Sequence, residues 1–161
     1  MKNVIKLFFT TIFSAAVLLS CKKDENKIYF EGGTNPLLTA SSTAPMVLLL
    51  ANKDKPAITF SWTNPNYMFT TGVSSQSVNY ILQVDTTGAN FTNPKRQEKA
   101  IDKDLSVALT VKDVNNFLTK MELAHSVPHS IEFRIKSSLA NGSVPLYSNV
   151  VKITITPYLD F

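Results

Sequence analysis

The chain of 161 residues carries a formal net charge of +4 and is 44% hydrophobic, which fits one globular domain. Its only two arginines, Arg96 and Arg134, lie in different segments, so it lacks the clustered basic charge that binds nucleic acid. A single cysteine, Cys21, excludes an internal disulfide.

Residues 1–20 have the features of a bacterial signal peptide. Two lysines precede an apolar run from Leu7 to Leu19, and no acidic residue occurs before Asp24. A run of this length is typical of a signal-peptide core and is short for a membrane-spanning helix. It ends in the residues LLSC, which resemble the lipobox of bacterial lipoproteins. The sequence predicts cleavage after Ser20, and the alternative is an uncleaved anchor helix with an incidental cysteine.

The lipobox resemblance gives Cys21 a covalent role. In such lipoproteins the cysteine sulfur carries a diacylglycerol and the freed amine carries a further acyl chain such as palmitate. Each buried methylene contributes about 0.8 kcal/mol, so several chains make attachment to the membrane effectively permanent. Cleavage would leave 14 basic and 12 acidic side chains, a net charge of +2.

Residues 21–35 are predicted to be the lipidated cysteine followed by a flexible tether. The stretch Lys22–Lys27 is charged and has nothing to bury. Its acidic residues resemble the surface-export signal of Bacteroidetes lipoproteins, although lysines are mixed with them. Lys22 also differs from the aspartate that retains many lipoproteins in the inner membrane. We therefore expect a lipid-anchored outer-membrane protein that is exposed at the cell surface.

Residues 36–161 are predicted to form one all-β domain. Short alternating segments rich in Val, Ile, Thr and aromatic residues are separated by Pro, Gly, Asn and Ser. The alternation places Trp62 on the same strand face as Ile58 and Phe60, and so in the core. The expected strands are residues 37–41, 46–51, 57–62, 78–84, 105–110, 130–136 and 148–157. About seven strands are typical of an antiparallel immunoglobulin-like or fibronectin-III-like β-sandwich.

One segment departs from strand periodicity and predicts a short helix. Its apolar residues recur at spacings of three and four and are Val111, Val114, Phe117, Leu118 and Met121. We expect Thr110 to cap this helix and Asp113 to complement the dipole of its first turn. Such an apolar stripe favours a helix packed across the open end of the sandwich over a docking site.

Three passages, taken with the lipobox, resemble the amino-terminal domain of the SusE family. They are ITFSWT at 58–63, YILQVD at 80–85 followed by NF at 90–91, and YSNVVKITITP at 147–157. The resemblance covers most of residues 30–161. It implies an outer-membrane lipoprotein of a Bacteroidetes glycan-utilisation system.

The same resemblance implies a non-enzymatic accessory in polysaccharide or starch capture and uptake. Its expected partners are a TonB-dependent transporter and a SusD-like lipoprotein. In the family, glycan contacts are made chiefly by carbohydrate-binding modules after the amino-terminal domain, and this sequence ends at Phe161. We therefore expect a reduced, structural or partner-binding version. The alternative is a structural or adhesive cell-surface β-sandwich module unrelated to glycans.

Two aromatic residues are candidates for contact with a glycan. An aromatic ring covers the apolar face of a sugar while neighbouring amides and hydroxyls satisfy its hydroxyl groups. Tyr67 and Phe69 lie in the polar stretch after Pro65 and could form such a platform. Loop aromatics are also often packed beneath their own loop, and this alternative stays open.

No metal, cofactor or catalytic site is predicted. His125 and His129 are four residues apart, but Pro128 lies between them and no third ligand is near. Asp102 and Asp104 are not followed by the glycine and further acidic ligands of a calcium loop. The sequence also contains no G-x-S-x-G motif and no glycine-rich phosphate loop. It therefore favours a binding protein over an enzyme.

Overall fold

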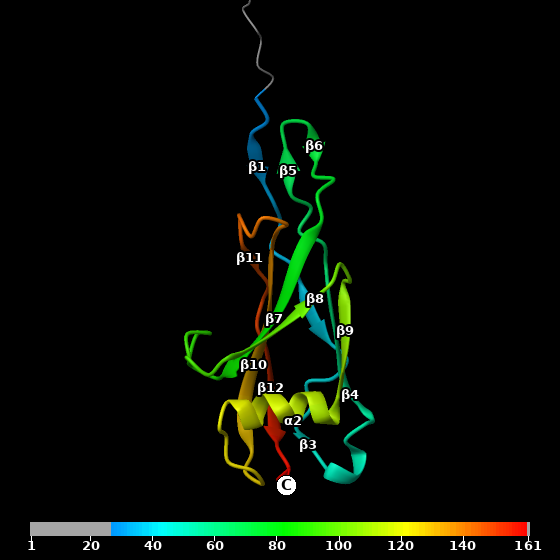
Figure 1. Cartoon of the computed structure of the whole chain (residues 1–161), viewed down its shortest axis with the longest axis vertical. Coiled ribbons are helices and arrows are strands. Elements are labelled where there is room, and N and C mark those ends of the chain that lie inside the picture. The colour runs from blue at the N-terminus through cyan, green and yellow to red at the C-terminus, as the bar shows by residue number, and fades with distance from the viewer. Residues whose placement is uncertain (1–26, 161) are drawn as a thin grey trace, which may run out of the picture.

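The strands of the computed structural model form two packed sheets and a smaller third sheet at one end (Figure 1). The structure describes residues 27–160. The predicted signal peptide and Cys21 lie outside the described residues. Within residues 27–160, none of the helices is long and apolar enough to cross a membrane.

The larger sheet has the strand order β3-β12-β10-β7-β8, and β11 pairs with β10. Its strands are β3 (Met46–Val47), β7 (Val78–Thr86), β8 (Gln97–Ile101), β10 (His129–Leu139), β11 (Leu146–Tyr147) and β12 (Val151–Thr156). β3 and β12 are parallel, whereas the other pairs are antiparallel. The second sheet has the order β2-β4-β9, with β2 (Leu38–Ala40), β4 (Pro56–Trp62) and β9 (Ser106–Thr110).

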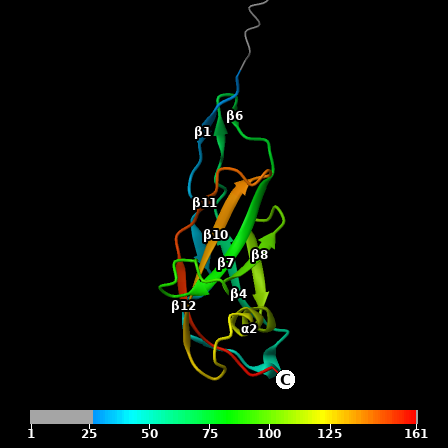
Figure 2. The same ribbon diagram turned by 60° about the vertical axis from the view of Figure 1, so that its left-hand side comes forward.

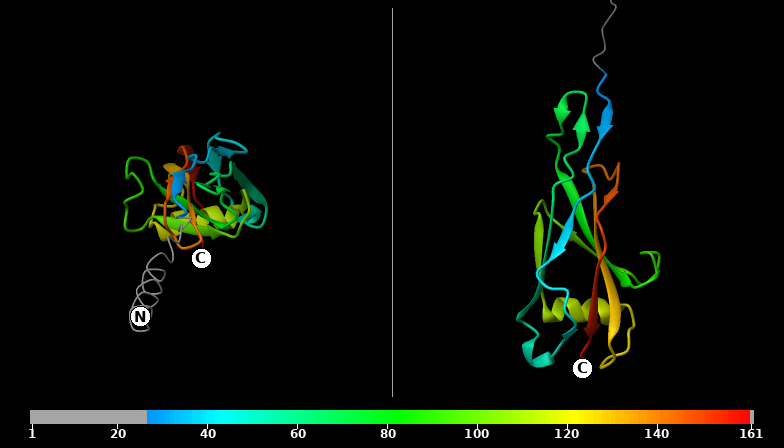
Figure 3. Two further views of the ribbon diagram at one scale, coloured as in Figure 1. Left: turned by 90° about the horizontal axis from the view of Figure 1, so that it is seen from above. Right: turned by 180° about the vertical axis from the view of Figure 1, so that it is seen from behind.

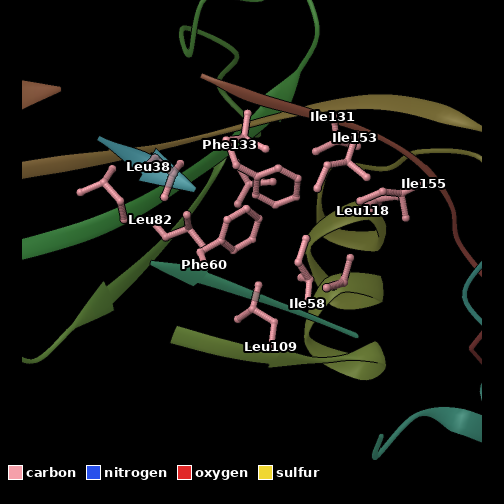
Figure 4. Packing of buried hydrophobic residues seen from close by; sticks show 14 of the residues in the cluster. Leu38, Ile58, Phe60, Leu82, Leu109, Leu118, Ile131, Phe133, Ile153 and Ile155 are labelled. Carbon is pink, nitrogen blue, oxygen red and sulfur yellow. The ribbon is translucent and has the colours of Figure 1, made fainter. Parts of the chain in front are cut away.

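The core lies between these two sheets. The strand register pairs Phe133 with Val84 and Ile135 with Leu82, and all four side chains are buried. Phe60 from β4 faces Phe133 from β10 across the core, with ring centroids 4.8 Å apart (Figure 4). Buried apolar residues from both sheets surround this pair, so the two-residue periodicity of the strands is the direct cause of the sandwich.

Helix α2 (Val111–Lys120) lies across one end of the sandwich (Figures 1 and 3). The Thr110 hydroxyl accepts a hydrogen bond from the Asp113 amide, and the Asp113 carboxylate accepts one from the Thr110 amide. This reciprocal capping box ends the preceding strand and starts the helix. Val114 and Leu118 enter the core from the helix. Both the predicted helix and its predicted cap are confirmed.

The third sheet has the order β1-β5-β6 and projects from the opposite end of the molecule (Figures 1 and 2). Its strands are β1 (Phe30–Gly32), β5 (Met68–Phe69) and β6 (Gly72–Val73). We call residues 28–32 and 67–76 the tip. The C-terminal end of the chain lies beside α2, far from the tip (Figure 1).

The all-β sandwich is confirmed, and the structure adds strands that the sequence patterns did not predict. β1 lies within residues 21–35, where a tether was expected, and it pairs with β5. β5, β6 and β11 have two residues each, too few for an alternating pattern. The single-turn 3₁₀-helix η1 (Leu50–Asn52) replaces the end of the strand expected at 46–51.

Candidate functional site

The structure places one of the two candidate glycan residues inside the protein. Tyr67 is 1% exposed, and its hydroxyl donates a 2.8 Å hydrogen bond to the carbonyl oxygen of Val144. Its hydroxyl also lies 3.4 Å from the Ser137 hydroxyl on β10. Burial raises the pKa of Tyr67 above its ordinary value. Its ring face is therefore not offered at the surface, and the residue ties the tip to the larger sheet.

The other candidate, Phe69, is half-buried on β5. It packs edge-to-face against Phe30 of β1, with ring centroids 5.5 Å apart. Phe30 in turn lies 6.1 Å from the Tyr67 ring. The structure thus brings both predicted residues together with a third aromatic that the sequence patterns had assigned to a tether.

A hollow of about 290 Å³ lies beside Phe69 in the tip. Its wall is made of apolar and uncharged polar side chains: Ile28, Phe69, Thr71, Val73, Ser74, Ser75 and Gln76. A second hollow of about 270 Å³ shares Gln76 with the first and is lined also by Asn64, Ser77, Val78, Tyr80, Lys103 and Leu105. Both hollows lie on the tip side of the sandwich, away from α2.

A second aromatic site lies on the outer face of the larger sheet. The guanidinium carbon of Arg134 is 4.0 Å from the centroid of the Phe91 ring and 4.3 Å from that of Tyr147. We call these three residues the arginine stack. Phe91 is buried, whereas Tyr147 is 37% exposed. The cation therefore holds an exposed ring in a fixed position through its favourable interaction with the ring face.

Polar side chains continue from the arginine stack across the sheet. The register aligns Arg134 with Gln83 and Gln83 with Glu98, in one row over β10, β7 and β8. The Arg134 Nε donates to Gln83 Oε1 at 2.7 Å, and Gln83 Nε2 donates to Glu98 Oε1 at 2.7 Å. The hydrogen bond from Gln83 lowers the pKa of Glu98, and burial lowers the pKa of Arg134. The row places the Arg134 guanidinium against the exposed ring, a buried amide in the middle and an exposed carboxylate at its far end.

The loop between β7 and β8 shapes this site. Asn90 and Phe91 both have positive φ angles, of 52° and 57°, which turn the Phe91 ring back over the sheet. The buried Asp85 carboxylate accepts hydrogen bonds from the amides of Thr86 and Asn93 and so fixes both ends of the loop. Sequence patterns did not identify this site, because strand periodicity gives no sign of a loop ring stacked on Arg134.

Four residues have a spacing that raised the question of a metal site: Asp102, Asp104, His125 and His129. Asp102 and Asp104 are exposed in the turn before β9. The His129 Nε2 is 2.7 Å from the Ala124 carbonyl oxygen, and His125 is exposed. Within residues 27–160, no group of three or more His, Cys, Asp or Glu side chains is placed to hold a metal ion.

Comparison with family models decides the relationship. Residues 23–136 match the model of the SusE outer membrane protein. The chain belongs to the SusE family. The matched residues run from before β1 into β10, so they include the tip, helix α2 and the Phe91 loop. A search of the curated proteins finds no match.

Membership of the SusE family places the chain in the outer membrane, among the accessory proteins of Sus-type glycan systems. The SusE resemblance and the expected outer-membrane location are therefore both confirmed. The first two sequence passages lie within the matched residues, and the third, at 147–157, lies beyond them.

Proposed function

We propose that this SusE-family protein is a lipid-anchored, non-enzymatic accessory in polysaccharide or starch capture and uptake. In this proposal Cys21 carries the lipid, and the sandwich binds glycan together with transporter partners. Those partners are a TonB-dependent transporter and a SusD-like lipoprotein. Family membership supports the setting, and the arginine stack supports the mode of action.

The single observation that carries the binding role is the exposed Tyr147 ring stacked on Arg134. A sugar needs a rigid ring for its apolar face and hydrogen-bonding groups at its edge. Arg134 supports the ring and supplies donors, and the exposed Glu98 carboxylate at the other end of the row supplies an acceptor. The Gln83 amide between them is buried and holds both charged groups in place. Because this surface is built on β-strands, it is held in place before any ligand arrives.

Binding to insoluble starch by the mature protein tests this proposal directly. We expect Tyr147→Ala to weaken retention about tenfold, because the ring contact is lost. Tyr29→Ala is the matched control, since Tyr29 is also an exposed tyrosine but lies on the tip. Phe69→Ala tests the remaining sequence-based candidate, and a loss confined to that variant would move the glycan surface to the tip.

Pull-down of the mature protein from outer membranes tests the partner-binding part. Recovery of a TonB-dependent transporter or a SusD-like lipoprotein is the expected result. Recovery of neither partner, together with no retention on starch, would contradict the proposed function.

A further inference from the structure

The tip exposes more large apolar side chains than its small size would suggest. Ile28 and Val73 are both 63% exposed, and Tyr29, Phe30 and Met68 are also exposed. Three strands of two or three residues cannot bury these side chains among themselves. Ile28, Phe69 and Val73 line one hollow, and exposed apolar side chains grouped in this way indicate a site that contacts something other than water.

The tip carries little charge, because Glu31 on β1 is the only charged residue among residues 28–32 and 67–76. Residues 64–78 contain no Asp, Glu, Lys, Arg or His. Their polar side chains are hydroxyls and amides: Asn64, Asn66, Thr70, Thr71, Ser74, Ser75, Gln76 and Ser77. Aromatic rings, aliphatic side chains and uncharged hydrogen-bonding groups are the mixture that is stable at the boundary between lipid headgroups and acyl chains.

The tip is close in sequence to the predicted lipid anchor, and this closeness indicates which partner it contacts. Five residues separate Cys21 from Lys27, the first described residue, and the six Cα steps between the two span at most about 20 Å when fully extended. A lipid on Cys21 therefore keeps β1 close to the bilayer surface. Residues 22–27 contain three lysines and two acidic residues, a net charge of +1, so this stretch does not oppose contact with anionic headgroups.

We infer that the tip is a lipid-docking surface, which inserts Ile28, Tyr29 and Val73 into the headgroup region of the bilayer that holds the anchor. This inference rests on the proposed attachment through Cys21. The hollow beside Phe69 then accepts lipid rather than glycan.

The tip is coupled to the sandwich, so docking fixes the orientation of the whole domain. The Thr34 amide donates a 2.7 Å hydrogen bond to the Pro65 carbonyl, and Tyr67 is bonded to the Val144 carbonyl. A Cβ at Gly33, the residue after β1, would lie 2.8 Å from the Leu146 side chain and 3.0 Å from that of Tyr67, so the chain packs closely against β11 as it leaves β1. Lipid contact at the tip therefore directs helix α2 away from the bilayer (Figure 3).

Depth-dependent fluorescence quenching tests the inference on the mature acylated protein. Val73→Trp places a reporter on the tip, and Val47→Trp places a matched reporter on β3 near α2, where Val47 is 69% exposed. Trp62, the only native tryptophan, is buried and gives a constant background. The vesicles contain phosphatidylethanolamine and phosphatidylglycerol with brominated acyl chains.

We expect Val73→Trp emission to fall by about half in these vesicles, because docking places it 5–10 Å into the boundary region. Val47→Trp emission should stay unchanged. A second substitution, Ile28→Glu in the Val73→Trp protein, should restore the emission while the protein stays attached to the vesicles. Equal quenching at both positions, or at neither, overturns the inference.

Two further results separate this inference from the proposed function. If the mature protein does not attach to vesicles, lipid anchoring fails, and coupling Cys21 to a maleimide lipid then tests the tip alone. Quenching of Val73→Trp in that coupled protein supports docking, and its absence overturns docking. A change in Val73→Trp emission on adding soluble starch without lipid assigns the tip to glycan and also overturns the inference.

Discussion

The helix end and the tip close the sandwich in different ways. At the helix end, α2 buries Val111, Val114 and Leu118 in the main core. Among the tip residues, Tyr67 is the one large side chain that is fully buried. The helix end is therefore part of the core, whereas the tip is an attachment held by a few specific contacts.

The two ends also differ in how many charged residues lie near their exposed apolar side chains. The helix end exposes Val47, Leu49 and Leu50, but Lys53, Asp54 and Lys55 follow directly. The tip has apolar side chains without charges between residues 64 and 78. Exposure alone therefore does not indicate a docking surface, and the distinguishing feature is the scarcity of neighbouring charge, since Glu31 is the only charged residue of the tip.

The largest expected effect is a difference in folding stability between a substitution in the main core and one in the tip. Phe133→Ala removes a fully buried ring from the main core and should lower the free energy of unfolding by about 3–5 kcal/mol. Phe30→Ala, which removes a ring from the tip, should cost about 1 kcal/mol or less. Chemical denaturation of both variants measures the difference. Equal losses would show that the tip belongs to the core.

A smaller effect tests the joint between the two regions. Tyr67→Phe removes the hydroxyl that donates to the Val144 carbonyl and should cost about 1 kcal/mol. Amide hydrogen exchange should become faster in β5 and β6 and stay unchanged in α2. Tyr147→Phe is the control, because Tyr147 is partly exposed on the outer sheet face. If amide hydrogen exchange in the tip is unchanged, the Tyr67 hydroxyl does not couple the tip to the sandwich.

The smallest effect concerns the cap at the helix end. Although burial alone would raise the pKa of Asp113, hydrogen bonds from the Thr110 backbone and hydroxyl hold the pKa below its ordinary value. Asp113→Asn should therefore cost about 0.5 kcal/mol at neutral pH. Because the folded pKa is depressed, this contribution is complete above the unfolded pKa of about 3.9 and is lost as pH falls through the folded value.

Denaturation of the Asp113→Asn variant and the unchanged protein from pH 7 to pH 2 measures this effect. The stability difference should narrow below about pH 4. A difference that stays constant over the whole range would exclude the carboxylate charge as its source.

Sequence patterns predicted the parts of the fold that repeat over several residues. Tyr80, Leu82 and Val84 are buried on one strand face as their alternation indicated, and Trp62 is in the core. The Thr110 cap marked the start of α2 correctly. Each of these features depends on residues that are close in the sequence, so local spacing was sufficient.

The candidate sites depended on contacts between distant segments, and these were harder to predict. Tyr67 has polar neighbours in the sequence, which suggested exposure, but its contacts with Ser137 and Val144 come from 70 and 77 residues away. The arginine stack requires the left-handed backbone of Asn90 and Phe91. Strand β8 was missed because its outward residues, such as Glu98, are solvated and its sequence lacks β-branched residues before Ile101.

The placement of the chain ends has a mechanical consequence. The chain enters through β1 at the tip and leaves after β12 beside α2, so tension between its ends acts along the strands (Figure 1). Inter-strand hydrogen bonds lie across that direction, and the five residue pairs that join β12 to β10 would share a pulling load together. β1 is joined to β5 by two residue pairs and would separate first, while the sandwich stays folded.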